Sequence, residues 1–77
     1  MDAISAVRAV TDRSSKSMRA VSVDMGRSPG FISSMLTQGS TPGADTLAAI
    51  GGACGYSLAL VPSGRLPEGS IVIDPPR

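Results

Sequence analysis

Apolar residues recur at helical spacing through the first two thirds of the chain and then gather into short runs. Ile4, Val7 and Val10 are three residues apart, a spacing that places them on one face of an amphipathic helix. Asp2 stands at the N-terminal end, where the helix dipole favours a negative charge. The pattern therefore predicts a first helix over residues 3–12.

Two shorter apolar pairs follow. Val21 and Met25 are four residues apart, and Ile32 and Met35 are three apart, so each pair shares a helix face. Gly26 lies between them, and glycine tolerates the positive φ that a sharp turn often needs. Residues 17–37 therefore read as two short helices around a glycine turn.

The second of these helices has its own start signal. Ser28 is a suitable N-cap, and Pro29 suits the first helical position. We therefore predict a helix over about residues 28–37. Small and polar residues occupy its non-core face, and such a helix suits the major groove of DNA.

A further helix is predicted over residues 44–54. Leu47, Ile50 and Cys54 follow the spacing i, i+3, i+7 of a core-facing stripe. Gly51 and Gly52 are unfavourable in a helix by roughly 1 kcal/mol each relative to alanine. We interpret them as a place of close packing against another helix.

Residues 56–61 and 70–74 form two short apolar runs, each stopped by proline. They predict two strands of a β-hairpin. The predicted fold is mainly α, with about four helices and a C-terminal β-hairpin. Residues 1–57 would form a helix-turn-helix domain and residues 58–77 a dimerisation element, with one core containing Val21, Met25, Ile32, Leu47 and Ile50.

An isolated two-stranded hairpin is marginally stable in water. Ile71, Val72 and Ile73 stand in a row, which suggests that both faces or one edge are covered. Pairing with the same hairpin of a second chain would give a homodimer. The alternative is a hairpin that folds back on its own helices.

Residues 17–58 carry the spacing of a known family. Met25-Gly26 ends the first helix of the motif, and Phe31-Ile32-Ser33 stands in the second. Pro42 follows ten residues after Ile32. Thr46-Leu47, Ile50 and Gly55-Tyr56-Ser57-Leu58 complete the pattern. This arrangement resembles the Cro and phage-repressor (XRE) helix-turn-helix proteins.

The resemblance implies a lambda-repressor-like bundle and a phage or mobile-element repressor that binds double-stranded DNA. The chain departs from the family at three points. Met18 stands where the family often has glutamine, and Arg27 replaces an apolar turn residue. The second helix lacks the long side chains that read bases bidentately, apart from Gln38 near its end.

The formal net charge is only +1, which is low for a DNA-binding protein. The basic residues are nevertheless clustered, because Arg8, Arg13, Lys16, Arg19 and Arg27 all lie within twenty positions of one another. They form either a phosphate-facing rim or an ordinary solvated helix face.

The candidate DNA contacts combine this rim, the polar helix face and the loop that follows. Phe31 has an alternative place in the core, since it is next to Ile32. The predicted set is Lys16, Ser17, Arg19, Arg27, Ser28, Gly30, Phe31, Ser33, Ser34, Thr37, Gln38 and Ser40.

Other chemistry has little support in the sequence. One cysteine and no histidine give no intrachain disulfide and a poor zinc site, so Cys54 reads as a small core residue rather than a redox switch. No catalytic constellation, cofactor motif, membrane span or signal peptide is recognisable. We expect a cytoplasmic protein that is not an enzyme and needs no metal or cofactor.

Three function classes remain at this point. The first is a sequence-specific transcriptional regulator, and the second is the antitoxin subunit of a toxin–antitoxin pair. The third is a protein-interaction module on a helix-turn-helix scaffold, which the low net charge favours.

Overall fold

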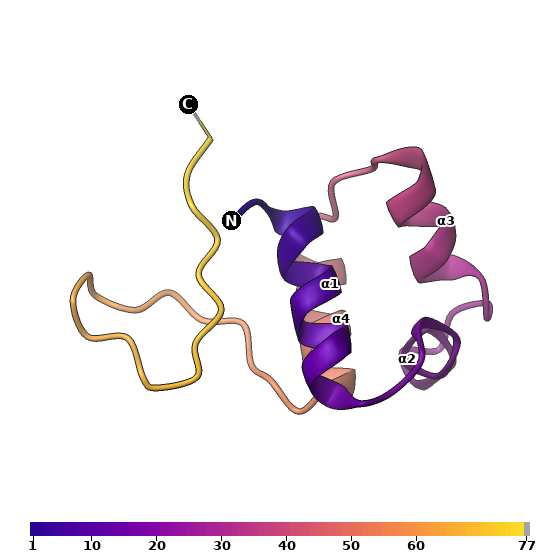
Figure 1. The fold of residues 1–77 in the computed structure, drawn as a ribbon, viewed down its shortest axis with the longest axis horizontal. Coiled ribbons are helices and arrows are strands. Elements are labelled where there is room, and N and C mark those ends of the chain that lie inside the picture. Colours follow the sequence, from indigo (N-terminus) through magenta and orange to yellow (C-terminus); the bar gives the residue numbers. More distant parts are fainter. Residues whose placement is uncertain (77) are drawn as a thin grey trace.

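A computed structural model describes residues 1–76 and contains four helices (Figure 1). They are α1 (Ala3–Ser14), α2 (Met18–Asp24), α3 (Phe31–Gln38) and α4 (Ala44–Ala53). Helix α1 packs on α4, and α2 contacts both α3 and α4. The four predicted helices are therefore confirmed, with shifted ends. No helix in the described part of the chain is long and apolar enough to cross a membrane.

Helix α1 begins at a side-chain cap. The Asp2 carboxylate accepts a hydrogen bond from the Ser5 backbone N–H at 2.7 Å. Hydrogen bonds from Ser5 lower the pKa of Asp2 below its ordinary value. The helix continues to Ser14, two residues beyond the predicted end, and stops where Ser15 adopts φ +61°.

The core contains residues from all four helices. Val7, Val21, Ile32 and Ile50 are fully buried. Met25 and Leu47 are half-buried and pack against this cluster. All five residues predicted to share a core therefore do so. Cys54 is also half-buried against the cluster, as expected of a small core residue.

The start of α3 was predicted three residues too early. Ser28 does not cap the helix, because its backbone carbonyl instead accepts a hydrogen bond from the Phe31 N–H at 3.1 Å. Pro29 and Gly30 form the intervening turn, and Gly30 is the N-cap without any side-chain bond. The Ser-Pro signal therefore marks a turn that leads into the helix.

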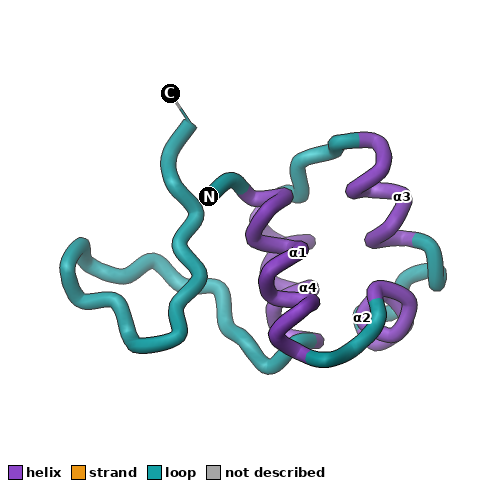
Figure 2. Tube along the Cα trace, in the orientation of Figure 1, coloured by secondary structure: helices purple, strands orange, loops and turns teal. Residues whose placement is uncertain are grey.

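The predicted C-terminal β-hairpin is wrong. Residues 1–76 contain no strand, and Figure 2 draws residues 54–76 as loop. The chain instead pairs with its own beginning, since the Asp74 N–H donates to the Met1 carbonyl at 2.9 Å. The Met1 ammonium donates to the Val72 carbonyl and forms an ion pair with Asp74. Within residues 1–76, residues 72–74 thus bond to the start of the chain and form no backbone hydrogen bond with the first apolar run.

The two glycines of α4 do not mark a helix–helix contact. A Cβ atom at Gly51 would meet only Tyr56, at 3.7 Å and beyond. A Cβ atom at Gly52 would meet nothing within 4 Å. Gly52 is therefore a helical glycine at an open site.

Candidate nucleic-acid interface

Ser22 connects the two helices of the motif. It is fully buried on α2, where its hydroxyl donates to the Met18 carbonyl at 2.7 Å. The same oxygen accepts a hydrogen bond from the Ile32 N–H at 3.1 Å. Gly26, with φ +81°, allows the turn between them. Ser22 thus satisfies a backbone donor in the first turn of α3, a group that lacks a partner within its own helix.

This role of Ser22 was not predicted from the sequence. A signal was present, because Met18, Ser22 and Met25 are spaced i, i+4, i+7. A hydroxyl within an otherwise apolar stripe needs a buried partner. That partner is the next helix of the motif.

Helix α3 has two faces of opposite character. Ile32, Met35 and Leu36 are buried and hold the helix on the core. The opposite side is exposed and carries only short or uncharged polar groups. These are four of the predicted site residues, Ser33, Ser34, Thr37 and Gln38.

An open groove of about 460 Å³ runs between α3 and the loop that leads to α4. Six predicted site residues line it, so the structure brings this half of the set together. They are Ser28, Gly30, Phe31, Ser34, Gln38 and Ser40. Five further lining residues were not among the predicted contacts. They are Thr41, Pro42 and Gly43 of the loop, Thr46 of α4 and Met35 of α3.

Arg27 and Phe31 form a stacked pair at the entrance to α3. The Arg27 guanidinium carbon lies 4.7 Å from the centroid of the Phe31 ring, a cation–π arrangement. Phe31 is half-buried and packs against the core cluster. The ring therefore holds the arginine beside the groove while it contributes to the core.

Two of the clustered basic residues have bonds within the fold. The Lys16 ammonium lies 2.9 Å from an Asp24 carboxylate oxygen and donates to the Ala53 carbonyl at 2.8 Å. Arg13 donates to the Gly69 carbonyl at 2.8 Å and to the Tyr56 hydroxyl at 3.3 Å. Lys16 thus ties α2 to the end of α4 in this structure.

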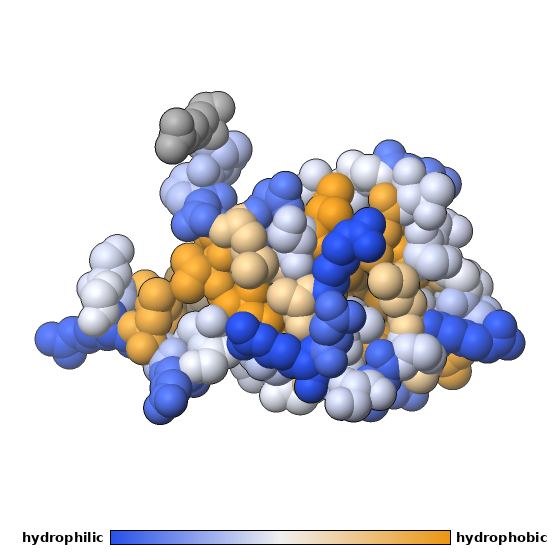
Figure 3. Space-filling view, viewed as in Figure 1, coloured by the Kyte–Doolittle hydropathy of each residue, from blue (hydrophilic) through white to orange (hydrophobic). Residues whose placement is uncertain are grey.

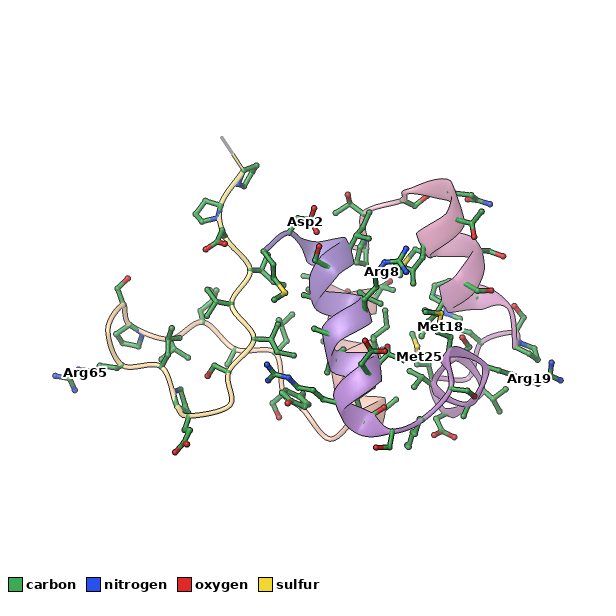
Figure 4. All side chains as sticks on the ribbon, viewed as in Figure 1. Asp2, Arg8, Met18, Arg19, Met25 and Arg65 are labelled. Atoms are coloured by element: carbon green, nitrogen blue, oxygen red, sulfur yellow. The ribbon has the colours of Figure 1, made fainter. Side chains whose placement is uncertain are left out.

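The remaining rim consists of Arg8, Arg19 and Arg27. All three are exposed, and no ion pair involves them within residues 1–76. Figure 4 draws Arg19 projecting from α2 at one end of the molecule, with Arg65 at the opposite end. Available positive charge therefore lies on α1, on α2 and in the turn before α3.

Ser17 lies at the start of α2 and acts as its N-cap. Its hydroxyl oxygen accepts a hydrogen bond from the Ala20 N–H at 3.0 Å. The hydroxyl hydrogen remains available as a donor, since a serine hydroxyl both donates and accepts. Ser17 therefore has a structural role that leaves one donor for an external group.

The described part of the chain contains no group of three or more Cys, Asp or Glu side chains that could hold a metal ion. Comparisons with protein-family models, curated proteins and solved structures found no match to this chain.

Proposed function

We propose that this protein is a sequence-specific, double-stranded-DNA-binding transcriptional regulator in which α3 enters the major groove. The observation that carries the proposal is the two-sided character of α3. One side is buried, and the other presents Ser33, Ser34 and Thr37 to solvent. A helix of about 10–12 Å diameter with a slim outer face fits a groove about 12 Å wide.

The charge distribution supports this orientation. Arg19 on α2 and Arg27 in the turn before α3 are both exposed. Arginines beside a groove-binding helix neutralise phosphates and fix its register. The stack on Phe31 restricts Arg27 before binding, so less side-chain entropy is lost in the complex.

Specificity would then come from short side chains. Serine and threonine hydroxyls donate to or accept from base edges, and the threonine methyl group can contact a thymine methyl group. Gly30 lies at the start of α3 and lines the protein groove beside that helix. Because glycine has no side chain, the backbone at this position can approach the DNA duplex closely. The low net charge implies weak nonspecific binding.

Fluorescence anisotropy with a labelled random-sequence duplex of roughly 30 base pairs, about three helical turns, tests the electrostatic part of the proposal. Binding should weaken as salt rises from about 50 to 200 mM. Arg19→Ala should reduce the slope of log affinity against log salt by about one unit. Arg65→Ala, at the opposite end of the molecule, is the matched control and should leave the slope unchanged.

Two results would count against the proposal. One is the absence of salt-dependent binding by the wild-type protein at concentrations up to about 100 μM, the weak end of nonspecific affinities. The other is an equal loss of slope in the Arg19 and Arg65 variants, which would indicate diffuse attraction without a defined interface.

A further inference from the structure

A partly open apolar hollow lies between the helix pair α1–α4 and the segment that follows α4. Its volume is about 70 Å³. Figure 3 shows an apolar area on the side of the molecule where this segment lies. One water molecule needs roughly 10–15 Å³ of such space, so the hollow has room for a group of about four to six non-hydrogen atoms.

The walls of the hollow are mostly hydrocarbon. Helix α1 contributes Ala6 and Val10, and α4 contributes Leu47. The segment after α4 adds Ile71 and Ile73. Water in such a space finds few hydrogen-bond partners, and an apolar group gains free energy by leaving water for it. The hollow is therefore suited to a small alkyl group.

Gly51 leaves part of this space unfilled. It follows Leu47 by four residues on α4, so the two share one helix face, and both line the hollow. A Cβ atom at Gly51 would lie 3.7 Å from the Cβ atom of Tyr56, an ordinary contact distance. A larger side chain at this position would therefore extend into the hollow.

A positive charge without a counter-ion lies at one end of the hollow. Ala6, Val10 and Arg13 are spaced i, i+4, i+7, so they share one face of α1. Arg13 donates to the Gly69 carbonyl and to the hydroxyl of Tyr56, which also lines the hollow. Both acceptors are uncharged, and within residues 1–76 no ion pair involves Arg13. The other N–H donors of the guanidinium group remain available for an anion.

We propose that the hollow binds a short branched-chain monocarboxylate. The alkyl group of the acid enters the space between the helices and the segment, and the carboxylate bonds to Arg13. A branched alkyl group of about four carbons fits the volume. Arginine pairs with carboxylates through parallel hydrogen bonds, so this end of the hollow selects an acid over a neutral analogue.

The location of the hollow leaves the proposed DNA surface free. Residues 57–76 lie on one side of the α1–α4 pair, and α3 lies on the other (Figure 1). The inference goes beyond the proposed function and does not depend on it, because binding of the acid is measured without DNA.

Titration of the full chain with isovalerate, an isobutyl group on a carboxylate, tests the proposal through the backbone amide NMR signals. Chloride salt keeps the ionic strength constant. The signals of residues that line the hollow, such as Ala6, Gly51 and Ile71, should shift saturably with a dissociation constant on the order of 1 mM, as expected of so small a ligand.

Two matched ligands separate the apolar and the charged parts of the interaction. Acetate carries the charge without the branched alkyl group, and isovaleramide carries the alkyl group without the charge. Each should bind at least about fivefold more weakly than isovalerate, because each lacks one of the two contacts.

A pair of leucine variants tests the apolar part in the protein. Gly51→Leu should weaken isovalerate binding at least about tenfold, because its side chain would occupy the hollow. Gly52→Leu is the matched control, since it makes the same change in the same helix at a position where a Cβ atom meets nothing within 4 Å. Its affinity should equal that of the wild-type protein. Circular dichroism verifies that both variants fold.

Arg13→Gln tests the charged part and stands whether or not the Gly51 variant folds. It should weaken isovalerate binding at least about fivefold and leave isovaleramide binding unchanged, which would show that the hollow is intact. Arg8→Gln is its control, because Arg8 is also an exposed arginine of α1 but does not line the hollow.

The absence of saturable shifts up to about 20 mM isovalerate, roughly twenty times the expected dissociation constant, would overturn the inference. Equal affinities for isovalerate, acetate and isovaleramide would do the same. Equal isovalerate affinity in the two leucine variants would overturn the hollow as the site, and wild-type affinity in Arg13→Gln would overturn recognition of the carboxylate.

Discussion

Within residues 1–76, Ser22 is the one residue whose side chain hydrogen-bonds α2 to α3, and replacing it by alanine removes that bond. The substitution deletes a donor to the Met18 carbonyl and an acceptor for the Ile32 N–H. Ile32 is fully buried, so water cannot easily take the place of the hydroxyl. The Ile32 N–H is then left without a partner at the start of α3.

The structure sets the size of the effect. A buried donor left unsatisfied costs about 1–3 kcal/mol, whereas the lost bond to Met18 costs less because that carbonyl also accepts within the helix. Alanine regains a few tenths of a kcal/mol through its higher helix propensity. The expected loss of unfolding free energy is about 1–3 kcal/mol, which corresponds to a Tm lower by roughly 5–20 °C in a domain of this size.

Urea denaturation followed by circular dichroism measures this loss, and an unchanged m-value would show that the two-state comparison holds. Ser33→Ala is the matched control, because Ser33 is exposed on α3 and undergoes the same change in helix propensity. It should change the unfolding free energy by less than about 0.5 kcal/mol. If Ser22→Ala also lowers the unfolding free energy by less than about 0.5 kcal/mol, the stabilising role of the Ser22 hydrogen bond between α2 and α3 is refuted. The same holds if Ser33→Ala lowers the unfolding free energy as much as Ser22→Ala does.

Four further substitutions test the fold. Ile50→Ala removes a fully buried side chain and should cost about 2–5 kcal/mol in the same denaturation experiment. Gly52→Ala should stabilise α4 by about 0.5–1 kcal/mol because its Cβ enters open space, whereas Gly39→Ala, at φ +69°, should destabilise the protein. Folding holds the pKa of Asp2 below its unfolded value, so the stabilisation from its ionised form is complete above the unfolded pKa and is lost as pH falls through the folded pKa. Asp2→Asn should therefore flatten the acid limb of a plot of stability against pH, and an identical limb in both proteins would refute this contribution.

The helices were predictable because their apolar spacing agrees with the final core. Val21, Ile32 and Ile50 each lie on an apolar stripe, and each is fully buried. The start of α3 was not predictable from local signals. Ser28 and Pro29 have the composition of a helix start, but the first turn of α3 takes its hydrogen bond from Ser22, ten residues before Ile32. Because this hydrogen-bond partner belongs to α2, the residues next to the start of α3 give no sign of it.

The prediction of a C-terminal hairpin was wrong for a different reason. Apolar β-favouring runs predict strand only if a partner backbone is available, and β-propensity depends on that context. Here Val72 and Asp74 bond to Met1, and within residues 1–76 the backbone groups of residues 57–61 form no hydrogen bond with another backbone group. The pattern of the run is compatible with a strand, but a single chain does not supply its neighbour.

The candidate site was predictable in composition and only partly in arrangement. The exposed polar face of α3 follows directly from the burial of its apolar stripe. Which basic side chains are free to contact DNA could not be predicted from the sequence, because a long lysine or arginine side chain can bond to residues far away in the sequence. Lys16 bonds to Ala53, and Arg13 bonds to Gly69. The basic cluster seen in the sequence therefore divides into bonded and available residues only after folding.

Selection of duplexes from a random double-stranded DNA pool tests most directly the claim that the outer face of α3 reads DNA sequence. The wild-type protein should enrich a defined motif over successive rounds. The double variant Ser33→Ala, Ser34→Ala should keep its fold and enrich a different or weaker motif, because both side chains are exposed on the proposed reading face. Absence of any enriched motif with the wild-type protein, or an identical motif and affinity in the double variant, would contradict the claim.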